Sequence, residues 1–137
     1  RPGVHPVSDL PRLLGRADVL VVALPLTGET EGLLDAELLG RLPEGALLVN
    51  ASRGAIVDTD ALVGLLNEGR LRAVLDVTDP EPLPPEHPLW EAKGALITAH
   101  IAGDSPLARR RAWDLVGEQV GRYVRGEELV NVVRGDY

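Results

Sequence analysis

The chain has 137 residues, enough to bury the core of one domain and too few for two domains of ordinary size. Its net charge of -7 argues against a nucleic-acid partner or an anionic membrane surface, since both select clustered Lys and Arg. It contains no cysteine, which excludes disulfides and thiolate chemistry and favours a cytoplasmic location. No apolar run reaches the length of a membrane span, so no membrane partner is expected.

The first quarter of the chain predicts one short helix and one strand. Ser8 is placed to cap a helix over residues 9–16, whose leucines share one face. A strand is then predicted over residues 18–24, because residues 19–24 form a continuous apolar run that a proline stops. After this strand, Thr27 and Thr30 either cap a helix or contact a cofactor, and capping is the more common role.

The middle of the chain repeats this alternation. Asp35 is expected to start a helix, and residues 46–50 form the next apolar strand. Asp58 or Thr59 then caps a further helix, which Gly69 closes.

Two more strands and a long helix complete the pattern. The strands are expected over residues 71–77 and 94–99, with a stiff proline-rich loop over residues 80–88 between them. Ser105 then caps a helix that reaches about Arg125. Strands alternating with helices indicate the α/β class, here a partial Rossmann-like, doubly wound parallel sheet. No G-x-G-x-x-G occurs, so the phosphate-binding turn of a dinucleotide fold is not in this sequence.

Three successive strand ends carry residues with useful chemistry. Arg53 follows the second strand, Asp76 and Glu81 follow the third, and His100 follows the fourth. A guanidinium offers paired donors to a carboxylate, and a histidine can move a proton near neutral pH. A neighbouring carboxylate favours the imidazolium and fixes its tautomer. Alone, each is most often structural, but together they describe a site for reducing a 2-oxo acid, with no metal-ligand pattern.

Six motifs follow in order along the chain. They are Leu24–Thr27 (LPLT), Val49–Gly54 (VNASRG), Leu75–Val77 (LDV), Pro80–Pro84 (PEPLP), His87–Trp90 (HPLW) and Thr98–Gly103 (TAHIAG). Together they closely resemble the D-isomer-specific 2-hydroxyacid dehydrogenases over nearly the whole chain. Many members of that family have proline where this chain has Ala99, a change in backbone stiffness that leaves the expected chemistry intact.

The resemblance implies a role for each site residue. Arg53 would bind the substrate carboxylate, His100 would donate and accept the proton, and Glu81 would pair with His100. Asp76 would meet the nicotinamide carboxamide of NAD or NADP. The remaining cofactor contacts would come from Leu24, Pro25, Ala51, Ser52, Arg53, His100, Ile101, Ala102 and Gly103.

Family members are longer, so the resemblance implies that residues 1–137 are the carboxy-terminal part of a dinucleotide-binding domain. Residues 105–137 would reach a substrate domain. In the strand order 3-2-1-4-5-6, residues 18–24 would be strand 3 and would lack a neighbour. Unpaired backbone is costly, so one of three arrangements is expected. These are a truncated sequence, direct pairing of residues 18–24 with residues 46–50, or pairing across a dimer.

The leading hypothesis is therefore an oxidoreductase that transfers a hydride between NAD(P) and a small D-2-hydroxy acid or 2-oxo acid. Glyoxylate and hydroxypyruvate are the expected kinds of substrate. By itself the chain should be inactive, and the family likeness favours a homodimer. The alternative is a non-catalytic module that senses dinucleotides or binds proteins on the same scaffold. Retention of Arg53, Glu81 and His100 together favours the enzyme, because a sensor needs no proton donor.

Overall fold

The computed structural model describes residues 3–133 of the chain. By backbone contacts these residues divide into two compact units, one ending at His100 and the other starting at Ile101. Each unit is described by itself.

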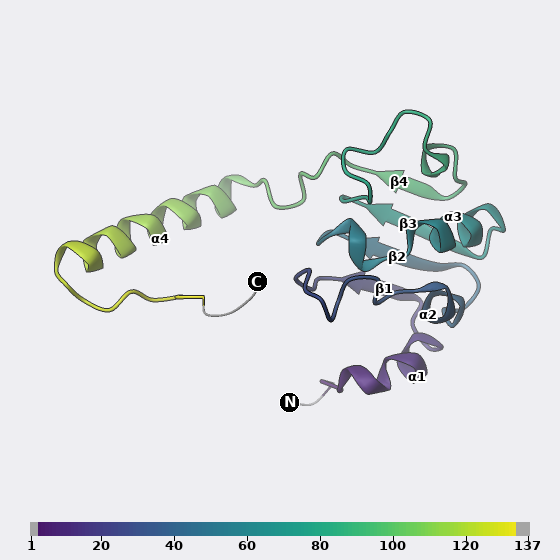
Figure 1. Cartoon of the computed structure of the whole chain (residues 1–137), viewed down its shortest axis with the longest axis horizontal. Coiled ribbons are helices and arrows are strands. Elements are labelled where there is room, and N and C mark those ends of the chain that lie inside the picture. The colour runs from purple at the N-terminus through teal and green to yellow at the C-terminus, as the bar shows by residue number, and fades with distance from the viewer. Residues whose placement is uncertain (1–2, 134–137) are drawn as a thin grey trace. The chain divides into compact units, whose positions relative to one another are not determined.

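The first unit is built on a single parallel sheet of four strands, drawn in Figure 1. The strands are β1 (Val19–Val22), β2 (Ala46–Asn50), β3 (Leu71–Leu75) and β4 (Ala95–Ile97). Their order in the sheet is the order in the sequence, β1-β2-β3-β4. The predicted α/β class with a parallel, Rossmann-like sheet is thus confirmed, although each strand except β2 is shorter than the residue range predicted for it.

The expected direct pairing of residues 18–24 with residues 46–50 is confirmed, whereas the assignment of residues 18–24 as strand 3 of the sheet is wrong. β1 pairs directly with β2, with Val19 opposite Leu47 and Val22 opposite Asn50. Of the three arrangements considered, direct pairing is therefore the one observed. The error came from counting residues 18–24 as strand 3 of the 3-2-1-4-5-6 order. Consecutive parallel strands joined through a helix are usually neighbours, and that tendency decides the order here.

Side-chain caps explain where two helices of this unit begin. Asp35 accepts a hydrogen bond from the Leu38 amide at the start of α2, and Asp58 does the same for the Ala61 amide in α3. Ser8, in contrast, makes no cap, because a 3₁₀ turn occupies its position and the following helix starts without a side-chain cap. The helical segments are η1 (Val7–Asp9), α1 (Leu10–Leu14), α2 (Ala36–Gly40), η2 (Gly54–Ile56), α3 (Thr59–Asn67) and η3 (Pro88–Trp90).

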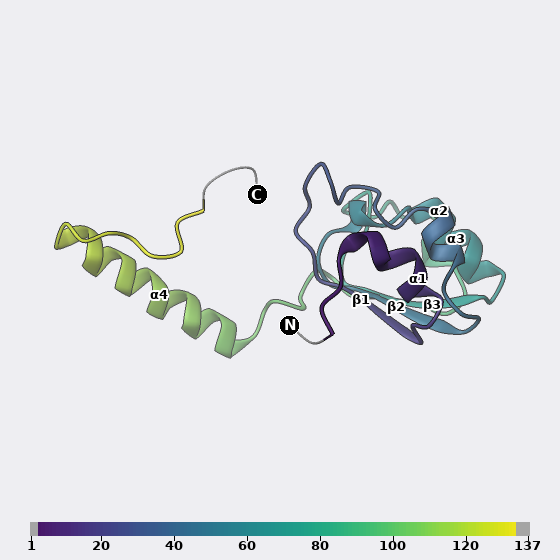
Figure 2. The same cartoon turned by 90° about the horizontal axis from the view of Figure 1, so that it is seen from below.

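Within residues 3–100, helices α1, α2 and α3 lie on one face of the sheet (Figure 2). A doubly wound sheet has helices on both faces, and in this described part the second face is open. Val19, Val21 and Leu96 point to that face and are more than half exposed.

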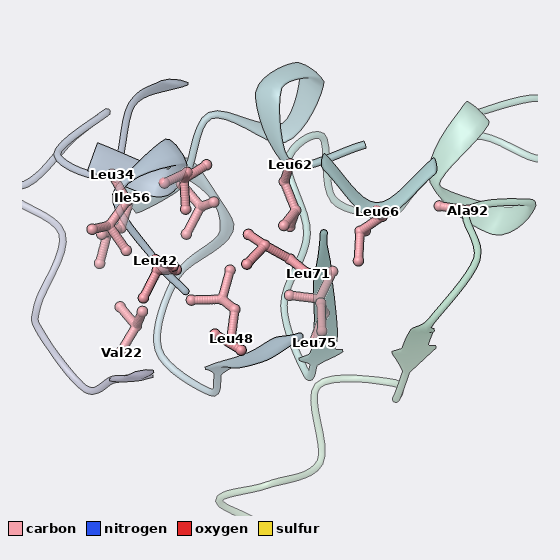
Figure 3. Close-up of a cluster of buried hydrophobic side chains, with 14 of the residues drawn as sticks. Val22, Leu34, Leu42, Leu48, Ile56, Leu62, Leu66, Leu71, Leu75 and Ala92 are labelled. Atoms are coloured by element: carbon pink, nitrogen blue, oxygen red, sulfur yellow. The ribbon is translucent and has the colours of Figure 1, made fainter. Parts of the chain in front are cut away.

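The core lies between the sheet and the three helices. Leu48 in the middle of β2, Ile56 in η2 and Leu66 in α3 are each 0% exposed. Figure 3 shows these neighbouring apolar side chains gathered above the strands. Because the strands that carry the site pack against the helices on this face, packing here positions the strand ends.

Replacing Leu48 with alanine should destabilise the first unit by about 2–5 kcal/mol, because a central, fully buried side chain leaves a cavity when it is truncated. Urea denaturation of residues 1–137 measures this loss. The same substitution at Leu96, which is 58% exposed in β4, should change the free energy of unfolding by no more than about 0.5 kcal/mol. Equal losses in the two variants would contradict this description of the core.

The second unit contains one long helix, α4 (Pro106–Val124). Ser105 caps it as predicted, accepting from the Ala108 amide at 3.0 Å. After the helix, the Val130 amide donates to Gln119 Oε1, which draws the following segment back along α4. The Arg125 guanidinium donates two hydrogen bonds to the Glu127 carboxylate and lowers the pKa of that carboxyl group. Among residues 3–133, no helix is both long and apolar enough to cross a membrane.

Candidate active site

The candidate site lies at the carboxyl edge of the sheet, where three neighbouring strands end in register. Asn50, Leu75 and Ile97 lie opposite one another at the ends of β2, β3 and β4. Arg53, Asp76 and His100 follow these residues within three positions, so all three leave the sheet at the same edge. Neighbouring strands are about 4.8 Å apart, which puts the strands carrying Arg53 and His100 roughly 10 Å from each other.

The Arg53 turn is held by backbone and side-chain contacts while its guanidinium stays exposed. Asn50 Nδ2 donates to the Arg53 carbonyl at 2.9 Å, and Arg53 Nη1 donates to the Ser52 carbonyl at 2.7 Å. The next residue, Gly54, is buried against the segment after β3. A Cβ atom on Gly54 would lie 2.0 Å from the Thr78 carbonyl oxygen. Only glycine therefore lets the two strand-end segments approach this closely.

His100 and Glu81 form an ion pair across the edge. His100 Nδ1 lies 2.6 Å from Glu81 Oε1, and the two side chains are 48% and 41% exposed. Because a carboxylate only accepts, Nδ1 donates, and Nε2 is left as the nitrogen for proton exchange. His100 has a φ of 54°, in the left-handed region that few non-glycine residues adopt. Such backbone conformations cluster at functional sites, where they aim a side chain.

Asp76 is a buried carboxylate, only 6% exposed. Its carboxylate accepts a hydrogen bond from Thr98 Oγ1 at 2.5 Å, and its amide donates to the Asn50 carbonyl at 2.9 Å. These contacts tie the ends of β2, β3 and β4 together. Asp76 therefore occupies a fixed position beside the His100–Glu81 pair.

A cavity of about 280 Å³ adjoins the ion pair. The polar residues that line it are His100, Glu81 and Asp76, and its apolar lining includes Leu83 and Trp90. Trp90 Nε1 donates to the Pro84 carbonyl at 2.8 Å, which pins the proline-rich loop over this cavity. Arg53 is not among the lining residues, so the structure joins His100, Glu81 and Asp76 in one hollow and sets Arg53 farther along the same edge.

The other predicted cofactor contacts lie at strand ends with exposed backbone. Leu24, Pro25 and Ala51 are exposed, and Ser52 is half-buried. Ile101, Ala102 and Gly103 follow His100 and are also exposed, in the second unit.

The threonines after β1 have a structural role. Thr30 Oγ1 accepts from the Thr27 amide at 2.8 Å and donates to the Pro25 carbonyl at 2.6 Å. They hold a turn and cap no helix, contrary to the more common role expected for them. His87 is also structural, since its Nδ1 accepts from the Leu89 amide at the start of η3.

Sequence reasoning missed two residues that organise the site, Asn50 and Thr98. Asn50 stands directly after four apolar residues, in a formal glycosylation sequon that carries no weight at a buried strand end. An amide-bearing residue between an apolar strand and a turn is a signal for a local side-chain to backbone bond, and could have identified it. The Thr98 contact joins two strands and has no local signal.

Comparison with known proteins agrees with this geometry. The family model of the D-isomer specific 2-hydroxyacid dehydrogenase NAD-binding domain matches residues 1–102. The chain belongs to this family. The matched domain binds a nicotinamide dinucleotide, NAD or NADP, as predicted.

Relatives of the 2-hydroxyacid dehydrogenase family show the extent of the likeness. A glyoxylate reductase from Thermofilum pendens is 40% identical over 121 residues, covering 88% of this chain and 36% of that protein. A mitochondrial formate dehydrogenase from Solanum tuberosum is 36% identical, covering 89% of this chain and 32% of that protein. The chain thus spans about a third of these curated relatives.

A solved 2-hydroxyacid dehydrogenase from Xanthobacter autotrophicus Py2, crystallised with NADPH and MES, superposes with a TM-score of 0.85. It is 40% identical, and the match covers 96% of this chain and 54% of that one.

The residues present fit the nicotinamide end of such a cofactor. A buried carboxylate at Asp76 is an acceptor suited to an amide group. A separate apolar cavity of about 240 Å³ lies at β1, and Leu20, Leu24 and Leu33 are among the residues that line it. The glycine turn for a pyrophosphate does not occur in these 137 residues.

Proposed function

We propose that the complete protein containing this chain is an NAD(P)-dependent dehydrogenase acting on a small D-2-hydroxy acid or 2-oxo acid, of the glyoxylate or hydroxypyruvate kind. The observation that carries the proposal is the His100–Glu81 ion pair, 2.6 Å long, at the sheet edge that also carries Arg53. A module that only senses dinucleotides has no use for a histidine held by a carboxylate and aimed by a left-handed backbone.

Each residue has a separate task in this proposal. When bound, the nicotinamide supplies or takes up the hydride at the substrate's α carbon. Arg53 holds the substrate carboxylate through paired N–H donors and polarises the neighbouring carbonyl. His100 gives its Nε2 proton to the carbonyl oxygen during reduction and takes it back during oxidation. Glu81 fixes the ring through Nδ1 and stabilises the imidazolium.

Arg53→Ala in the complete protein should raise the KM for a 2-oxo acid by roughly 10²-fold or more, because the substrate carboxylate loses its charged partner. The measurement is the rate of NADH or NADPH oxidation with glyoxylate and with hydroxypyruvate. A separate assay follows NAD⁺ reduction with formate. Arg41→Ala is the matched control, since Arg41 pairs with Glu37 on the exposed side of α2 and should leave KM within about twofold.

An Arg53→Ala variant that reduces these acids as fast as the parent would contradict the proposal. Activity of the parent on formate alone would reassign the substrate and keep the reaction class. Homodimer formation and a cytoplasmic location stay predictions.

A further inference from the structure

The turn that presents Arg53 is organised by one buried side chain. Asn50, the last residue of β2, is 1% exposed. Its Nδ2 donates to the Arg53 carbonyl at 2.9 Å, while its Oδ1 accepts from the Ser52 amide at 3.1 Å and from Ser52 Oγ at 3.0 Å. Both halves of the amide are thus used within the turn, so the side chain has one favourable orientation.

Asn50 also connects this turn with the neighbouring strand end. Its carbonyl accepts from the Asp76 amide at 2.9 Å, and in register it lies between Val22 of β1 and Leu75 of β3. The residue is therefore fixed by three strands before its side chain reaches the turn. A side chain held this rigidly can fix the Arg53 main chain relative to the sheet.

The exposure of Arg53 makes its main-chain position decisive. Arg53 is exposed, and its Nη1 donates to the Ser52 carbonyl of the same turn, so the turn itself places the guanidinium. The direction in which the side chain leaves the edge then depends on the Arg53 backbone, and Asn50 holds that backbone at the carbonyl.

We propose that Asn50 is a positioning residue for Arg53, setting through its amide the direction from which the guanidinium meets a substrate carboxylate. This inference rests on the proposed function and names a residue through which that site acts. Losing the anchor leaves the charge of Arg53 in place and lowers only the fraction of time it spends in the binding position.

Asn50→Asp is the sharpest variant, because it replaces one nitrogen by oxygen and keeps the acceptor for Ser52. It sets a carboxylate oxygen against the Arg53 carbonyl, so the turn must open. In the complete protein, we expect the KM for glyoxylate and the Kd for oxamate, an unreactive analogue, to rise by about tenfold or more. The Kd for NADPH or NADH, followed by fluorescence, should rise much less than the Kd for oxamate, because the cofactor contacts expected from this turn are shared with residues outside it.

Repeating the Asn50 substitution in the Arg53→Ala variant separates a loss of positioning from general damage to the fold. In Arg53→Ala protein, adding Asn50→Asp should change the glyoxylate KM by less than about twofold, because the group it positions is already gone. Asn67→Asp is the matched control, the same one-atom change at an exposed residue in the last turn of α3, and should behave like the parent. If Asn50→Asp does not fold, Asn50→Ser is measured in the same way.

Four outcomes decide between these possibilities. A parent-like oxamate Kd in the Asn50 variants would overturn the inference, and so would an equal loss with and without Arg53. The expected pattern, a loss that disappears in the Arg53→Ala background, would support it. A parent protein that neither binds oxamate nor reduces any 2-oxo acid would instead overturn the proposed function, before any Asn50 variant is compared.

Discussion

His100→Asn should slow reduction of the 2-oxo acid by roughly 10²- to 10⁴-fold in kcat, the usual loss when a positioned proton donor is removed. Asparagine is chosen for two physical reasons. Its amide nitrogen can replace Nδ1 as the donor to Glu81, which is 2.6 Å away in the parent. It also tolerates the left-handed backbone, which has a φ of 54° at this position. The variant therefore removes Nε2 while changing little else, and stopped-flow or steady-state NADPH oxidation measures the loss.

His87→Asn is the matched control for this prediction. His87 caps η3 through Nδ1, and asparagine is itself a good capping residue, so the fold and the rate should stay close to the parent. Retention of more than about a third of the parent's kcat in His100→Asn would remove His100 from the proposed chemistry.

Gly54→Ala should damage both stability and substrate binding. The new Cβ would meet three backbone atoms after β3, at 2.0 Å, 2.1 Å and 2.6 Å, and backbone cannot turn aside as a flexible side chain can. We expect a loss of at least about 1–3 kcal/mol in the free energy of unfolding, as for other overpacked sites. Because the displaced segment leads to Glu81, the KM for the 2-oxo acid should rise as well.

Gly64→Ala makes the same chemical change where nothing lies within 4 Å, on the exposed side of α3. There, alanine should be neutral or stabilise the helix by up to about 1 kcal/mol. Thermal or urea denaturation of both variants in the complete protein compares them directly. Equal unfolding midpoints would show that the approach of Gly54 to Thr78 is not a constraint on the fold.

Local signals in the sequence predicted the local structure well. Asp35, Asp58 and Ser105 each cap the helix expected of them, because a cap depends on a side chain and an amide only three residues apart. Ser8 fails for an equally local reason, since a 3₁₀ turn over Val7–Asp9 takes the place of the first helical turn.

Non-local pairing was harder to predict. The place of residues 18–24 in the sheet was inferred from counting strands, but the periodicity of an apolar run carries no information about which strand lies beside it. The prediction that Glu81 pairs with His100 came from family resemblance, and the 2.6 Å contact agrees with it. The backbone conformation of His100 and the contact between Thr98 and Asp76 depend on how separate strand ends meet, and no spacing rule encodes them.

The matching of sheet order to chain order has a consequence for how this four-stranded sheet assembles. Each parallel pair joins segments separated by one crossover only, so the sheet can grow by adding the newest strand to the edge just formed. Asn50 and Leu75 then acquire their neighbours in the order in which the chain is made. The edge that carries the candidate site would be completed last, when the short strand before His100 joins the sheet, so His100 would reach its place beside Glu81 only after the other three strands have paired.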